Sequence, residues 1–121
     1  MTAPNIVNVT SIYGKTHSAL LDTTLTTTQV TCDSNKILKI NSIIVANIDA
    51  SAAAEVTVKF NPASGTTAAL AQGVQVPNKS TLIVLGKDSP IYLNEGDTIE
   101  AGASANNDLE IIISYEELDD A

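Results

Sequence analysis

His17 is the only histidine in this 121-residue sequence, so acid–base chemistry near neutral pH would have to use it. Ser18 adjoins it and Asp22 follows, and these are the residue types of a catalytic triad. Neighbouring residues in a strand point to opposite faces, so His17 and Ser18 cannot converge on one substrate. The sequence also lacks a phosphate-binding glycine loop, a CxxC pair and a helix-borne histidine pair. We therefore predict that this chain is not an enzyme.

The strongest candidate for a metal site is an acidic turn. Asn94, Glu95 and Asp97 surround Gly96 and offer the oxygen ligands that Ca²⁺ prefers. Their spacing does not match the twelve-residue calcium loop, and turn chemistry explains the same residues. Cys32 is the single cysteine, so we expect a small buried hydrophobic residue and no metal-binding pair. We predict no metal and no cofactor, and whether this turn binds Ca²⁺ stays open.

The net charge of −8 restricts the choice of partners. All six basic residues are lysines, whereas nucleic-acid sites use clustered Lys and Arg to neutralise phosphates. We therefore expect no nucleic-acid partner. Acidic residues dominate the chain beyond Lys87, the last cation. This C-terminal part is either a solvated face that keeps the protein soluble or a surface that steers it toward a basic partner.

The elements that must position these residues have the periodicity of strands. Val56, Val58 and Phe60 alternate with polar residues, which predicts one buried and one solvated face. Residues 36–48 are apolar at both parities, so we expect a longer strand that is covered on both sides for part of its length. A bulge near Asn41 and Ser42 is expected to switch its faces.

Turn signals separate the strands every 8 to 12 residues or so, which is typical of an antiparallel sandwich or barrel. They occupy residues 61–65, 76–79, 86–90, 94–97 and 105–108, where Gly, Pro, Asn and Asp are concentrated. We expect no helix. The predicted fold class is all-β, a single antiparallel β-sandwich with Greek-key connections of the jelly-roll or immunoglobulin-like kind.

The length of 121 residues fits one domain. We expect an N-terminal arm and extended connection over residues 1–27 and a sandwich core over residues 28–121. An arm carrying Ile6, Val7 and Val9 could grip a neighbouring chain by strand addition. The alternative is that it pairs within its own domain.

No basic and apolar secretory signal opens the sequence, and the longest apolar stretch, residues 43–46, is far too short to cross a bilayer. We therefore expect no export route and no membrane partner.

A resemblance to a known group adds to these inferences. Its most specific part is residues 93–99, the pattern Leu-x-Glu-Gly-Asp-x-Ile, followed by small residues at 101–105 and a closing apolar strand at 111–117 that ends Ser-Tyr-Glu-Glu. The order of strands over residues 28–117 resembles that of small virion structural proteins of tailed phages, notably marine and cyanobacterial ones.

The resemblance implies a β-sandwich building block of a phage particle, assembled in the host cytoplasm, and no catalytic residues. The expected role is a capsid decoration (cement) protein that binds the major capsid protein or other virion subunits and stabilises the head shell. Alternatives are a neck or tail component, or a tail-tip module that binds glycans through Tyr13, Tyr92 and Tyr115. A homo-oligomer is expected, with a trimer as the guess by analogy.

Overall fold

The computed structural model describes residues 9–119 and forms nine strands in that range. The strands are β1 (Ser11–Leu20), β2 (Thr27–Thr31), β3 (Lys36–Asn47), β4 (Ala54–Asn61), β5 (Ala68–Val76), β6 (Thr81–Leu85), β7 (Ile91–Leu93), β8 (Thr98–Ala103) and β9 (Leu109–Asp119). The described residues contain no helix, and therefore none that could span a membrane. The prediction of an all-β fold is confirmed.

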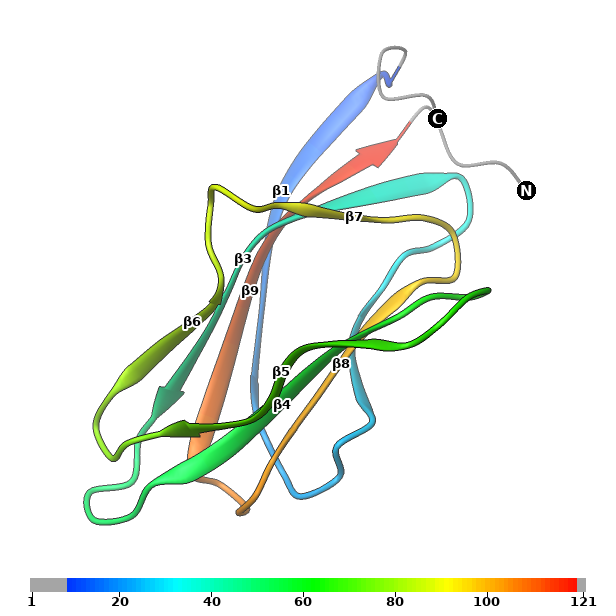
Figure 1. Cartoon of the computed structure of the whole chain (residues 1–121). Coiled ribbons are helices and arrows are strands. Elements are labelled where there is room, and N and C mark those ends of the chain that lie inside the picture. Colours follow the sequence, from blue (N-terminus) through cyan, green and yellow to red (C-terminus); the bar gives the residue numbers. More distant parts are fainter. Residues whose placement is uncertain (1–8, 120–121) are drawn as a thin grey trace.

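Two antiparallel sheets pack face to face (Figure 1). One has the order β1-β9-β3-β6, with β7 also paired to β3, and the other has the order β2-β8-β4-β5. When β6 and β7 are taken as one interrupted strand, successive strands alternate between the sheets, except for β4 and β5, which pair within the second sheet. This is the strand order of a jelly roll, in which each sheet mixes strands from both ends of the chain. The strand order therefore favours the jelly-roll form over the immunoglobulin-like one.

The first strand differs from the sequence prediction. We expected residues 1–27 to be an N-terminal arm and extended connection, but Ser11–Leu20 forms β1 and pairs with β9 along its whole length, from Ser11 opposite Asp119 to Leu20 opposite Glu110. Its side chains that face the second sheet are mostly polar, so the strand carries no hydrophobic alternation. Backbone pairing holds it in place. The first strand of the sandwich thus begins well before residue 28.

The core is aliphatic. Val56, Val58, Ile111 and Ile113 have no exposed surface, as their alternation predicts. Phe60 is only partly buried at the margin of the core. Branched aliphatic side chains suit the pleated faces of two stacked sheets, because they are stiff and fill the space between the layers.

Two local features have clear causes. The register between β3 and β9 shifts between Ile40 and Ser42, which confirms the bulge predicted there. A Cβ at Gly102 on β8 would come within 2.4 Å of the Thr24 carbonyl oxygen. The small residue at position 102 therefore lets the connection between β1 and β2 lie directly on the second sheet.

Candidate functional site

The structure does not assemble a triad around His17. Its Nε2 atom lies 2.9 Å from Oε1 of Gln29, a residue on β2, so the pair links the two sheets. The carboxylate of Asp22 accepts a hydrogen bond from the backbone N–H of Thr24 instead. Ser18 faces the other side of β1. His17 therefore has a structural partner and no nucleophile.

The acidic turn is held by backbone donors. Asp97 is buried, and its two carboxylate oxygens accept the N–H groups of Asn94 and Ala63, both at 2.9 Å. Oε2 of Glu95 accepts the N–H of Asn35 at 2.6 Å. These bonds account for the carboxylates by turn chemistry. Within residues 9–119 no cluster of His, Cys, Asp and Glu could hold a metal ion.

Cys32 is 1% exposed, as expected for a small buried residue, and lies just after β2. Burial raises the pKa of its thiol to about 11. Its thiol donates to the carbonyl oxygen of Lys36 at 3.2 Å. A thiol of this kind is a poor nucleophile at neutral pH.

One residue of the acidic C-terminal part is structural. Glu117 is buried, and its carboxylate oxygens lie 3.2 Å from Nζ of Lys15 and 3.3 Å from Nζ of Lys36. Glu117 on β9 thus ties together the neighbouring strands β1 and β3. The acidic part is not a wholly solvated face.

The residues suggested for partner binding do not form one site. Ile6 and Val7 lie outside the described residues, and Val9 is half-buried just before β1. Tyr13 on β1 and Tyr92 on β7 are exposed but lie at opposite flanks of the first sheet. Tyr115 packs against the core. The structure therefore builds no platform from the three tyrosines.

An apolar surface instead lies on the outer face of the first sheet. Ile112 on β9 is directly opposite Ile44 on β3, and Ile44 is opposite Ile83 on β6. Ile83 is 65% exposed, Ile112 is 42% exposed, and Ile44 is partly buried. We call these three residues the isoleucine row. It crosses three neighbouring strands on a face with no second layer within the described residues.

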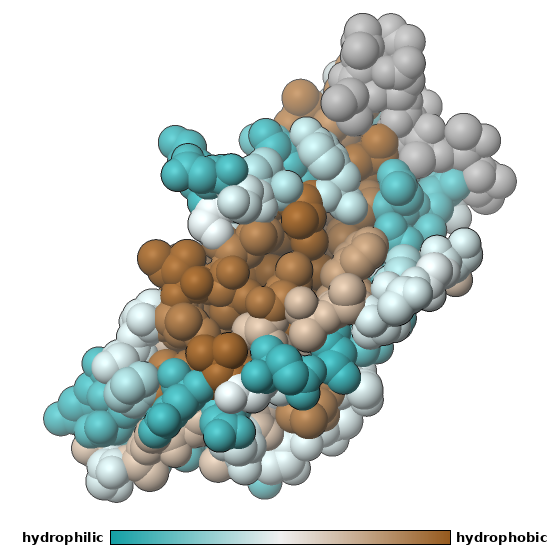
Figure 2. Space-filling model, in the orientation of Figure 1, coloured by the Kyte–Doolittle hydropathy of each residue, from teal (hydrophilic) through white to brown (hydrophobic). Residues whose placement is uncertain are grey.

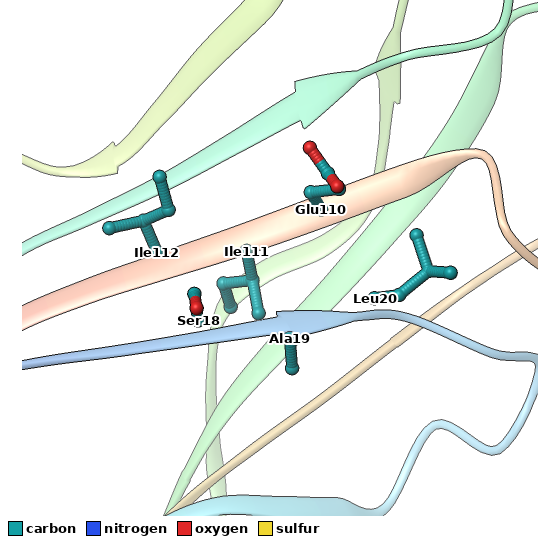
Figure 3. Close-up of a pocket in the computed structure, with 6 residues that line it drawn as sticks. All are labelled: Ser18, Ala19, Leu20, Glu110, Ile111 and Ile112. Carbon is teal, nitrogen blue, oxygen red and sulfur yellow. The ribbon is translucent and has the colours of Figure 1, made fainter.

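A hollow of about 390 Å³ lies beside the row, where β1 and β9 run together. Figure 3 shows Ser18, Leu20, Glu110 and Ile112 on one side of these two strands and Ala19 and Ile111 on the other. Leu20 is 49% exposed and extends the apolar surface onto β1. The hollow is open and carries one carboxylate, so it suits contact with another protein surface more than an enclosed small ligand.

The sequence carried a signal for the row that we used only in part. Residues 43–45 and 111–113 are each three apolar residues in succession. Such runs indicate strands that are apolar on both faces. We expected residues 36–48 to be covered on both sides for part of their length, and every residue of β3 is at least partly buried. The exposed outer side chains belong to the neighbouring strands, with Ile112 on β9 and Ile83 on β6.

A second apolar surface lies where the two sheets part, along the side formed by β5, β6 and β7 (Figure 2). A hollow of about 170 Å³ there is lined by Phe60, Ala68, Leu70, Ile91 and Tyr92. This side exposes the margin of the core. The first sheet therefore carries apolar surface on its outer face as well as at its β6–β7 edge.

Comparison with known proteins gives a likeness in structure and none in sequence. No family model and no curated protein matches this sequence. A chain from the acidic stable capsid structure of Helicobacter pylori bacteriophage KHP30 is similar in fold, with a TM-score of 0.52 and 9% sequence identity. The alignment covers 93% of this chain and 91% of that chain. The likeness is therefore one of fold, and it extends over the whole sandwich.

Proposed function

We propose that this chain is a structural protein of a phage virion, and more narrowly a decoration protein that binds the outside of the head shell. The observation that carries the proposal is the isoleucine row, an exposed apolar stripe on the outer face of the first sheet. Side chains from three neighbouring strands, with Leu20 beside them, form one contiguous apolar surface, and contiguous exposed apolar surface is what a protein partner can bind. The likeness of the fold to a capsid chain supports the same reading.

The free energy of binding that the isoleucine row can contribute suits attachment at many equivalent positions. The exposed parts of Ile83 and Ile112 together amount to about one whole isoleucine side chain. Its burial would contribute roughly 2 kcal/mol, far less than a stable single contact needs. Many weak contacts become strong when copies are linked on a repeating surface. A shell with many equivalent positions provides such a surface.

The charge of the chain agrees with an exterior position. At −8 it would be repelled by packaged DNA, whereas the outside of a shell imposes no such cost. The major capsid protein or another virion subunit is the expected partner. His17 is paired with Gln29, and no group of three or more His, Cys, Asp or Glu among residues 9–119 could hold a metal ion. We propose a binding role without catalysis.

Antibody labelling of virions tests the proposed position of this chain on the head. Antibody against this chain, applied to purified virions, should label the head at regular intervals. Labelling confined to the neck or tail would support a neck or tail component and reject decoration. Particles that contain none of the chain would reject a virion role altogether. A glycan array tests the receptor role with the purified protein. Binding to any glycan would favour that role, and the absence of binding would support the structural role.

A further inference from the structure

Five strands, β1, β2, β5, β6 and β7, form the edges of the two sheets and differ in how well they are protected against pairing. β2 has five residues and a shift in register, β6 has five residues and a shift, and β7 has three residues. β5 has two shifts and a glycine, Gly73, with a φ of +58°. Short strands and bulges are among the devices that prevent edges from pairing. β1 has ten residues and an unbroken register, so it lacks both of these, and its one charged side chain, Lys15, is engaged by Glu117 on β9 of the same chain.

On the side of β1 away from β9, the backbone N–H and C=O groups come from every second residue. The N–H of Leu21 donates to the carbonyl oxygen of Leu109 on β9 at 2.8 Å. Successive backbone groups of a strand point to opposite sides, so the odd-numbered residues of β1 bond β9 and the even-numbered ones point away from it. Among residues 9–119, β1 pairs with β9 alone. The backbone from Ile12 to Leu20 therefore presents a ladder of donors and acceptors at the edge.

We propose that this edge pairs antiparallel with β1 of a second copy, around a two-fold axis at Thr16. In that register Ile12 lies opposite Leu20 of the second copy, and Gly14 lies opposite Ser18. Ile12 is 60% exposed and Leu20 is 49% exposed in the single chain, so each would cover the other. Apolar and Thr–Thr pairs across strands are favourable, and the strand is thus complementary to itself.

The two neighbouring registers of the β1–β1 pair give less favourable side-chain pairs across the strands. A shift that moves the axis to Lys15 puts this lysine opposite itself, which is unfavourable for like charges, and leaves Ile12 opposite Ser18. A shift that moves the axis to His17 puts Ile12 opposite Asp22. Of these three registers, only the one centred on Thr16 places Ile12 opposite Leu20 of the second copy, and it does so without placing Lys15 opposite itself.

The dimer would join the two β1-β9-β3-β6 sheets into one continuous sheet. Because the two-fold axis runs through the sheet, the isoleucine rows of both copies would lie on the same outer face. The apolar face available to a partner would double without any change within either chain. The pairing follows from β1 alone and does not depend on the proposed place in a virion.

Cysteine cross-linking tests the register in the full-length chain. In a strand pair of this type the Cα atoms of opposed residues are about 5.5 Å apart, within the range for a disulfide. Thr16→Cys should therefore give a covalent dimer on mild oxidation. Ser18→Cys is the matched control, because it lies about 13 Å from its counterpart in this register and should not cross-link. Cys32 is buried and can remain.

Sedimentation across a range of protein concentrations tests the pairing itself, and wild type should form a dimer. Ile12→Lys combined with Leu20→Lys places like charges opposite each other at both ends of the pair and should return the chain to a monomer. Ile12→Lys combined with Leu20→Glu restores opposite charges and should keep the dimer. Both positions are exposed, so circular dichroism should show all variants folded. A monomeric wild type, equal cross-linking of Ser18→Cys, or identical behaviour of the two double variants would overturn the proposal.

Discussion

Adjacent isoleucines on β9 allow a sharp test of which sheet face is the core. Ile113 is fully buried between the sheets, whereas Ile112 is 42% exposed on the outer face. Ile113→Ala removes three buried carbon atoms and the contacts around them, which costs about 2 to 5 kcal/mol because neighbouring strands cannot close the cavity. Ile112→Ala removes partly solvated atoms and should cost at most about 1 kcal/mol, mainly through lower strand propensity.

Urea unfolding measures this difference directly. Both variants should keep the dependence on urea of the wild type, and only the midpoint should move, by at least twice as much for Ile113→Ala. Thermal melting should show the same order, at about 4 °C for each kcal/mol in a domain of this size. Equal losses for the two variants, or a larger loss for Ile112→Ala, would mean that the packing of β9 has been assigned to the wrong face.

Two further substitutions and one labelling experiment each test a single feature of the structure. Glu117→Gln should lower the melting temperature by a few degrees at low salt, because two lysines lose their partner, and the loss should shrink in 1 M salt; a loss independent of salt would contradict an electrostatic origin. Burial and the nearby carboxylate of Asp49 raise the pKa of Asp108. The ionised form of Asp108 is therefore disfavoured in the folded chain. This carboxyl group favours folding at low pH, and it opposes folding as the pH rises through its folded pKa. Asp108→Asn should therefore raise the melting temperature at pH 7 and change it little near pH 3, and a drop at pH 7 would contradict this sign. Cys32 should resist a thiol reagent at pH 8 until urea unfolds the chain, and fast labelling of the native protein would show that it is not buried.

Side-chain periodicity predicted the parts of the fold in which burial depends on alternation. Val56 and Val58 face the core because every second residue of β4 is apolar and branched. The bulge at Asn41 was visible because Asn41 and Ser42 separate two apolar runs of β3. The turns were visible from residues with special backbone preferences.

β1 was missed because its pattern carries no such information. Lys15 and His17 face inward at the margin of the sandwich, where an ion pair and a hydrogen bond to Gln29 replace apolar contacts. An edge strand held by its backbone has no characteristic side-chain alternation. The isoleucine row was hidden for a related reason, since it joins residues on three strands whose pairing no local pattern reveals.

The most direct test of the central claim is binding to head shells that lack this chain. Purified protein should sediment with such shells and saturate at a fixed number of copies per capsid subunit. Ile83→Lys combined with Ile112→Lys should abolish this binding, whereas Ile48→Lys, at an exposed apolar position after β3, should bind as wild type does. Failure of the wild type to sediment with the shells, or full binding by the double variant, would contradict the claim that the isoleucine row is the docking surface.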